Sequence, residues 1–206
     1  PLALMSNELI LKDRARLLEL AGESNLSTGE IDWLTNLAQR YRVVADDGSL
    51  ANADDIPELL NRVDAVPVSL MLAQGVEESG WGTSRFAIKG NAVFGQWTYK
   101  KGKGIVPDKR NEGAKHEVRA FDELRGSIDA YVFNLNTHRA YKKFRARRAA
   151  LRKSGQDVTG AELIKTLDRY SERGAAYIGT IRTIMRVNGM GAFDRSRLRV
   201  ALGSDT

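Results

Sequence analysis

The stretch VEESGWGTSRFAIKGNAVFGQW, residues 76–97, joins the end of an apolar segment to a glycine-rich break. From Val66 to Val76, apolar residues occur on nearly every side of a helix, which predicts a central and buried helix. Pro67 suits the first turn of that helix, and Gly80 and Gly82 indicate where it ends. Two adjacent glutamates lie just before the break, so the sequence places carboxylates at the end of a buried helix.

Glu77 and Glu78 are these two residues, and whichever faces inward is expected to have a raised pKa. Apolar surroundings disfavour the charged form, the negative end of the helix dipole acts in the same direction, and the neighbouring carboxylate adds repulsion. Trp81, three residues after Glu78, offers an apolar wall. A carboxyl group that stays protonated near neutral pH can act as the general acid of glycoside hydrolysis. The alternative is an exposed pair at a frayed helix end, and helical phase does not choose between the two glutamates.

Length and composition predict a folded protein of 206 residues, either one domain or a domain with an N-terminal extension. The chain is 42% hydrophobic, which argues against disorder, and it has no cysteine, which excludes disulfides and thiolate metal sites. The opening PLALMSNEL has no basic flank and only a short apolar run, so we interpret it as a mature form or a trimmed chain and not as a signal peptide. No run reaches the roughly 18 apolar residues of a membrane span, so none is expected.

The net charge of +6 suggests an anionic partner such as nucleic acid, a membrane surface or an acidic cell-wall polymer. The densest basic segment is HRAYKKFRARRAALRKSG, residues 138–155. A solvated helix face is favoured for it over an anion-binding face, because only two aromatic residues interleave the charges and no nucleic-acid motif surrounds them. We therefore expect no nucleic-acid partner. The basic residues concerned are Arg145, Arg147, Arg148, Arg152 and Lys153.

The pattern along the chain predicts an α+β fold that is mostly α, with a small β element after the buried helix. An amphipathic helix is expected over 7–22, a helix start with a capping box at Ser27 or Thr28, and a linker or long loop over 44–55. The predicted strands are roughly 94–100, 104–108 and 115–121, and the later helices are 124–136, 138–153, 159–169 and 174–188. A helical extension over 1–54 would pack on a catalytic domain over 55–206.

The motif around the break resembles glycoside hydrolase family 73, the bacterial β-N-acetylglucosaminidases of peptidoglycan. That family has a helix ending in Glu-Ser-Gly-Trp-Gly, then Ser, then Asn, an apolar pair, Phe and Gly, which residues 78–95 reproduce in order. The segments RVDAVPVSLMLAQG, GIVPDKRNEGAKHEVRAF, SIDAYVFNLNTHRAY and YIGTIRTIMRVN are similar to the Bax-type members, and the similarity runs from about residue 55 to 195. The resemblance implies a lysozyme-like fold, with a β-hairpin lobe beside a helical lobe, and Glu78 as the general acid.

The resemblance also implies a second carboxylate from the β element, for which the candidates are Glu117, Glu112 and Asp108. Glu117 is preferred, because it lies in an alternating strand, whereas Glu112 lies beside a glycine and looks like a turn residue. Glu77 is then a neighbour without a catalytic role. Side chains predicted to bind substrate are Trp81, Asn91, Phe94, Gln96, Trp97 and Tyr177, and core packing is the open alternative for the aromatic ones.

The predicted function is cleavage of the β-1,4 bond after N-acetylglucosamine in peptidoglycan glycan strands. The alternatives are a lytic transglycosylase, which needs a single acid/base, and a wall-binding module with a silent site. We expect no cofactor and no metal, since the two histidines, His116 and His138, are not spaced as a local zinc-binding pair. We also expect a monomer in the periplasm or cell envelope.

Overall fold

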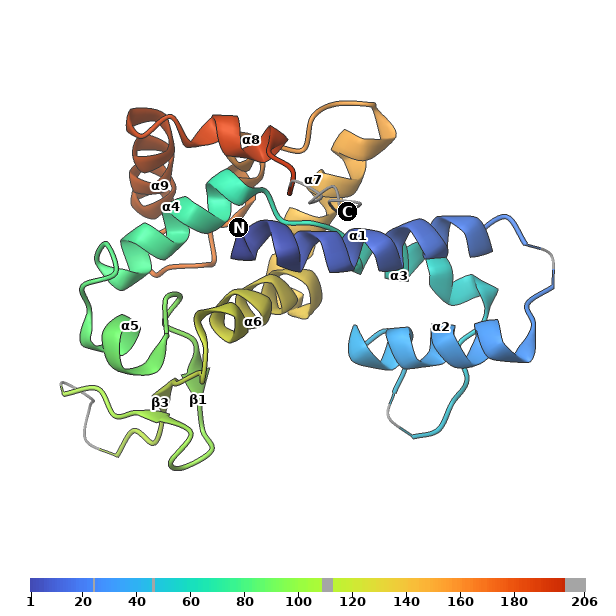
Figure 1. Cartoon of the computed structure of the whole chain (residues 1–206), viewed down its shortest axis with the longest axis horizontal. Coiled ribbons are helices and arrows are strands. Elements are labelled where there is room, and N and C mark those ends of the chain that lie inside the picture. Colours follow the sequence, from blue (N-terminus) through green and yellow to red (C-terminus); the bar gives the residue numbers. More distant parts are fainter. Residues whose placement is uncertain (24, 46, 109–112, 199–206) are drawn as a thin grey trace, which may run out of the picture.

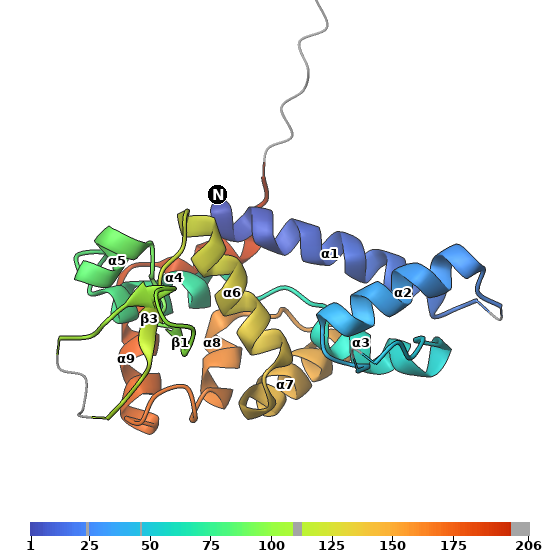
Figure 2. The same ribbon diagram turned by 90° about the horizontal axis from the view of Figure 1, so that it is seen from below.

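The computed structural model describes residues 1–23, 25–45, 47–108 and 113–198. Most of the described chain is helical, and the small sheet and the α2–α3 pair lie at opposite ends of the molecule (Figures 1 and 2). The α-helices are α1 (Leu2–Leu20), α2 (Thr28–Arg40), α3 (Ile56–Arg62), α4 (Val68–Ser79), α5 (Arg85–Gly90), α6 (Leu124–Thr137), α7 (Lys142–Lys153), α8 (Gly160–Leu163) and α9 (Ala175–Val187). Short 3₁₀ helices are η1 (Ala53–Asp55), η2 (Arg139–Tyr141), η3 (Ile164–Thr166) and η4 (Met190–Arg195).

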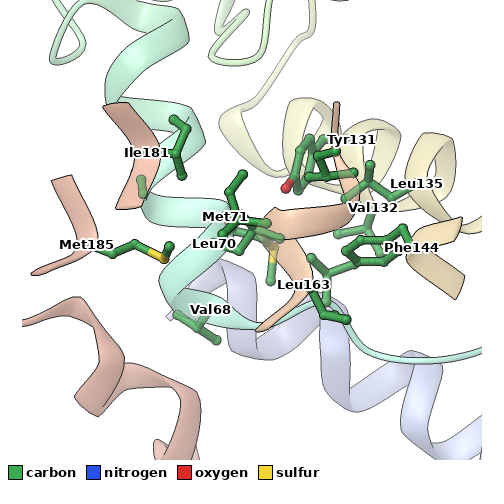
Figure 3. Close-up of a cluster of buried hydrophobic side chains, with 14 of the residues drawn as sticks. Val68, Leu70, Met71, Tyr131, Val132, Leu135, Phe144, Leu163, Ile181 and Met185 are labelled. Carbon is green, nitrogen blue, oxygen red and sulfur yellow. The ribbon is translucent and has the colours of Figure 1, made fainter. Parts of the chain in front are cut away.

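Helix α4 lies at the centre of the main hydrophobic core, as its all-round apolar sequence predicts. It packs against α8, α9 and η4, and its side chains meet those of α6 and α7 (Figure 3). Leu70 and Ala73 are fully buried. The helix ends at Gly80, whose φ of 57° is left-handed and therefore suits a residue without a side chain. The buried helix and its glycine stop are both confirmed.

The sheet has three short strands, β1 (Trp97–Thr98), β2 (Gly104–Ile105) and β3 (Glu117–Arg119). The order is β1-β3-β2 and both pairings are antiparallel, so the last strand in the sequence is central. The prediction of a strand beginning at residue 94 was wrong, because Phe94 packs in the helical core, with its ring 4.0 Å from that of Tyr131. The mostly α architecture with a small antiparallel sheet, expected of a lysozyme-like fold, is confirmed.

The N-terminal segment forms a second hydrophobic cluster between α1, α2 and α3. Helix α1 reaches both clusters, with Ala3 in the main core and Leu17 in the second. The predicted capping box begins α2, where the Glu30 carboxylate accepts hydrogen bonds from both the backbone N–H and the hydroxyl of Ser27. The division into 1–54 and 55–206 stays a prediction.

Candidate active site

Glu78 lies half-buried in the last turn of α4. Burial raises the pKa of its carboxyl group and the charge of Glu77 acts in the same direction, whereas a hydrogen bond from Tyr177 and the charge of Arg173 oppose them. The net effect is a pKa above the ordinary value for glutamate. The group therefore keeps its proton to a higher pH than an exposed glutamate does, as a general acid requires.

Tyr177 of α9 holds Glu78 in place. Its hydroxyl donates a hydrogen bond of 2.9 Å to Oε1 of Glu78, and it accepts one of 2.8 Å from Nε2 of Gln74. The tyrosine is 1% exposed and its ring stacks on that of Tyr170, with the centroids 5.5 Å apart. The ring of Tyr177 is thus part of the core and its hydroxyl contacts Glu78, while substrate binding by Tyr177 stays a prediction.

Glu77 is engaged elsewhere. Its Oε1 accepts a hydrogen bond of 2.6 Å from Arg173, whose other nitrogen donates to the hydroxyl of Thr180. The two adjacent glutamates therefore have different partners: Glu77 has a cation and Glu78 a tyrosine hydroxyl. The choice of Glu78 as the general acid stays a prediction.

Two predicted substrate-binding aromatics lie on the surface. Trp81 is 66% exposed and takes a left-handed φ of 59° after the C-cap Gly80 of α4, so the core-packing alternative for this residue is wrong. Trp97 is 61% exposed, and one face of its ring stacks on His116 at 4.1 Å between centroids. Both indoles expose apolar surface, Trp81 after the end of α4 and Trp97 at the start of β1.

The other three predicted binding residues make structural contacts. Asn91, the left-handed C-cap of α5, donates to the carbonyls of Phe121 and Asp122. Gln96 donates to the carbonyl of Ser127, and Phe94 is buried against Tyr131. These contacts support core packing for Phe94, while substrate binding by Asn91 and Gln96 stays a prediction.

Glu117, the preferred second carboxylate, makes structural hydrogen bonds within the sheet region. It is 7% exposed, and its carboxylate accepts hydrogen bonds of 2.9–3.1 Å from the backbone N–H groups of Gly102 and Gly104. It therefore fastens the turn before β2 onto β3. Asp108 is exposed and pairs with Arg85 at 3.0 Å, and Glu112 lies outside the described residues. The identity of the second carboxylate stays a prediction.

Hollows elsewhere on the surface do not include Glu78. One of about 620 Å³ is lined by residues of α4, α8, α9 and η4, and another of about 680 Å³ lies beside the first half of α1. Among the described residues, no group of three or more His, Asp or Glu side chains is placed to hold a metal ion.

Comparison with known proteins identifies the family of this chain. The glucosaminidase profile, described as mannosyl-glycoprotein endo-β-N-acetylglucosaminidase, matches residues 53–188. The chain belongs to the glucosaminidase family. It is also 36% identical over 179 residues to Protein bax of Escherichia coli (strain K12), a match that covers 86% of this chain and 62% of the relative. No solved structure matches it.

In the basic segment, the prediction of a solvated helix face is wrong for Arg145 and Arg148 of α7, whereas Arg147, Arg152 and Lys153 are exposed as predicted. Arg145 and Arg148 of α7 are 3% and 0% exposed. Arg145 donates to the carbonyls of Leu135 and His138, and Arg148 donates to backbone carbonyls of residues 61, 64 and 65. Arginine suits this task because its planar guanidinium carries five donors. The positive charges of Arg145 and Arg148 are therefore used inside the fold.

No helix in the described part of the chain is long and apolar enough to cross a membrane.

Proposed function

We propose that this glucosaminidase cleaves the β-1,4 glycosidic bond after N-acetylglucosamine in peptidoglycan glycan strands, with Glu78 as the general acid. The observation that carries the proposal is the half-buried carboxyl group of Glu78 at the end of α4, with a raised pKa and one oxygen held by Tyr177. A protonated carboxyl group can give its proton to the leaving glycosidic oxygen, which makes that oxygen a better leaving group.

The exposed tryptophans are the proposed sugar-binding platforms. Trp81 follows Glu78 by three residues, and Trp97 begins the sheet. An aromatic face buries the apolar face of a sugar ring when the two stack, so two exposed indoles suit a polysaccharide better than a small soluble substrate. The net charge of +6 favours an anionic wall polymer. The proposed location is the periplasm or cell envelope, and the proposed state is a monomer.

A lytic transglycosylase is the second candidate, and the contacts of Glu117 favour it. A hydrolase gains from an anion across the bond from the acid, whereas a transglycosylase uses an internal sugar hydroxyl and needs one carboxyl group. The Glu117 carboxylate is occupied by two backbone amides. A silent wall-binding module is disfavoured, because a binding surface has no need of a half-buried acid held by a tyrosine.

Digestion of purified peptidoglycan distinguishes these functions. We expect products with reducing N-acetylglucosamine ends, identified by borohydride reduction and mass spectrometry. Anhydro-muramyl products, each lighter by one water, would replace the hydrolase with the lytic class. Wall binding without any release of products would reject both enzymes.

Glu117→Gln is expected to loosen the sheet. An amide has one acceptor oxygen where the carboxylate has two, and it loses the charge that strengthens the bonds to Gly102 and Gly104, so the fold should lose roughly 1–3 kcal/mol. We expect KM for glycan strands to rise more than kcat falls. The measurement is steady-state kinetics together with thermal unfolding.

Gly104→Ala is the matched control for Glu117→Gln. A Cβ at Gly104 would lie 2.3 Å from the carbonyl oxygen of Val118, so this variant disturbs the same turn while the carboxylate stays. Similar kinetic losses in both variants would support an anchoring role. A fall in kcat alone, seen in Glu117→Gln and absent from Gly104→Ala, would return Glu117 to the predicted role of second catalytic carboxylate.

A further inference from the structure

Three buried side chains form a continuous chain of hydrogen bonds that ends at Glu78. The hydroxyl of Tyr131, on α6, donates to Oε1 of Gln74 at 2.6 Å. Nε2 of Gln74, on α4, donates to the hydroxyl of Tyr177 at 2.8 Å, and Tyr177 donates to Glu78 at 2.9 Å. Gln74 is fully buried and the two tyrosines are each 1% exposed. Gln74 and Tyr131 lie outside the Glu-Ser-Gly-Trp-Gly motif, in two of the segments that are similar to the Bax-type members.

All the hydrogen bonds in this series donate toward Glu78, and the orientation of the Gln74 amide determines that direction. A glutamine side chain has a donor end and an acceptor end. Because Tyr131 donates to its oxygen, the amide nitrogen faces Tyr177 and occupies a lone pair of that hydroxyl. The hydrogen of Tyr177 then points to Glu78. With the amide reversed, Tyr177 would donate to Gln74 instead, and Glu78 would lose its donor.

We propose that Gln74 and Tyr131 are positioning residues that direct the Tyr177 hydroxyl onto Oε1 of Glu78 and so leave the acid proton on Oε2. This inference rests on the proposed role of Glu78 as general acid. In the transfer, the Oε2–H bond breaks and a bond from that hydrogen to the leaving glycosidic oxygen forms. The bond from the anomeric carbon to that oxygen breaks, and its electron pair stays with the oxygen, which leaves as a sugar hydroxyl. The electron pair of the broken Oε2–H bond stays on the carboxylate, where the hydrogen bond from Tyr177 stabilises the new charge. Neighbouring bonds in such a chain strengthen one another.

Substitutions at Gln74 and Tyr131 leave the other groups that face Glu78 unchanged. These groups are Glu77 on α4, Arg173 before α9, Tyr141 of η2 and Tyr170 after η3. The hydrogen bond from Tyr177 lowers the pKa of Glu78, so weakening it raises that pKa further. The acid form then persists to higher pH. When the Tyr177 hydroxyl is no longer directed onto Glu78, the plateau of the kcat–pH profile is therefore expected to fall. The basic limb of the profile is expected to move to higher pH.

The test compares the pH dependence of kcat on peptidoglycan for four variants. Tyr131→Phe removes one hydroxyl and keeps the ring that stacks on Phe94, and Gln74→Met keeps the side-chain length. We expect each to lower the plateau by roughly tenfold, about the value of one hydrogen bond, and to shift the basic limb upward. The control is Tyr41→Phe, which removes the hydroxyl of a tyrosine buried in the second cluster and should leave the profile unchanged.

Gln74→Glu distinguishes a role in orienting the Tyr177 hydroxyl from a role in filling space in the core. As a neutral acid, Glu at this position can accept from Tyr131 and donate to Tyr177, so activity should recover toward the wild-type value at acidic pH. Once ionised, it accepts from both tyrosines, draws the hydrogen of Tyr177 away from Glu78, and activity should fall. A side chain that only fills space predicts the opposite, with Gln74→Met equal to or better than Gln74→Glu at every pH.

Wild-type profiles in folded Tyr131→Phe and Gln74→Met, checked by circular dichroism, would overturn the proposal. The failure of the proposed function would look different. If Glu78→Gln remains active, the general acid itself is wrongly assigned; if it is inactive while the Gln74 and Tyr131 variants behave as wild type, only the positioning role fails.

Discussion

Glu78→Gln is expected to lower the rate of peptidoglycan cleavage by about 10²-fold or more, while the protein stays folded. The amide matches the carboxyl group in shape, and its oxygen can still accept the hydrogen bond from Tyr177. It has no acidic proton to give to the leaving oxygen, so the loss should appear in kcat. The measurement is release of soluble glycan fragments from purified peptidoglycan, together with thermal unfolding.

Glu77→Gln is the matched control, because it makes the same chemical change one residue away. Glu77 is paired with Arg173 and lies outside the proposed proton transfer, so a mild effect is expected. An equal loss in both variants would show that the acid was assigned to the wrong glutamate. Substantial activity in a folded Glu78→Gln protein would remove Glu78 from its role.

The pH dependence of peptidoglycan cleavage by the wild-type protein provides a second check on Glu78. Its pKa is raised above the ordinary glutamate value, so the acid form and the rate should persist to a higher pH than an exposed glutamate allows and then fall. In Glu78→Gln this basic limb should disappear.

The sequence predicts well what is decided by local signals. The end of α4 follows from an apolar run that stops at a glycine, and the start of α2 follows from Ser27 and Glu30. Both depend on residues within one or two turns of each other. The position of Glu78 in the last turn of a buried helix is of the same kind.

Tertiary partners are what the sequence pattern does not reveal. Helix α5 was not predicted, because its six residues are too few to show a periodicity. The order of the strands and the task of Glu117 depend on which backbone amides meet in space. Arg148 was predicted to be solvated, yet it is fully buried, because carbonyls from three positions of another segment converge on it. The contacts of Gln74 with two tyrosines from other helices are of the same kind.

Asp64 has charged partners from two helices that are distant in the sequence. Its side chain is 2% exposed and lies within 3.6 Å of Arg14 of α1 and of Arg148 of α7, while Arg152 pairs with both of its oxygens at 2.5 Å. Burial opposes ionisation of Asp64, but the three guanidinium groups outweigh it and hold its pKa below the ordinary value. One carboxylate thus joins the N-terminal helix to the basic helix through the segment that precedes α4.

Acid should weaken this arrangement. Because the pKa of Asp64 is lower in the folded state than in the unfolded chain, its stabilisation is fully present above the unfolded value, about 3.9. The contribution is lost as the pH falls below that value toward the folded pKa. Denaturant unfolding at a series of pH values should show the loss in the wild type and not in a variant without the carboxylate.

Asp64→Ala is expected to lower the free energy of unfolding by about 3–5 kcal/mol, because it leaves the buried guanidinium of Arg148 without its counter-charge. Asp157→Ala is the control: it removes the same residue type from a pair with Arg195 in which both side chains are largely exposed, and should cost about 0–1 kcal/mol. Urea unfolding of the two variants measures the difference. Equal costs would mean that the carbonyls around Arg148 suffice to hold α7. A large cost in Asp64→Ala alone would show that the fold depends on the pairing of Asp64 with the arginines around it, including Arg148 and Arg152 of α7.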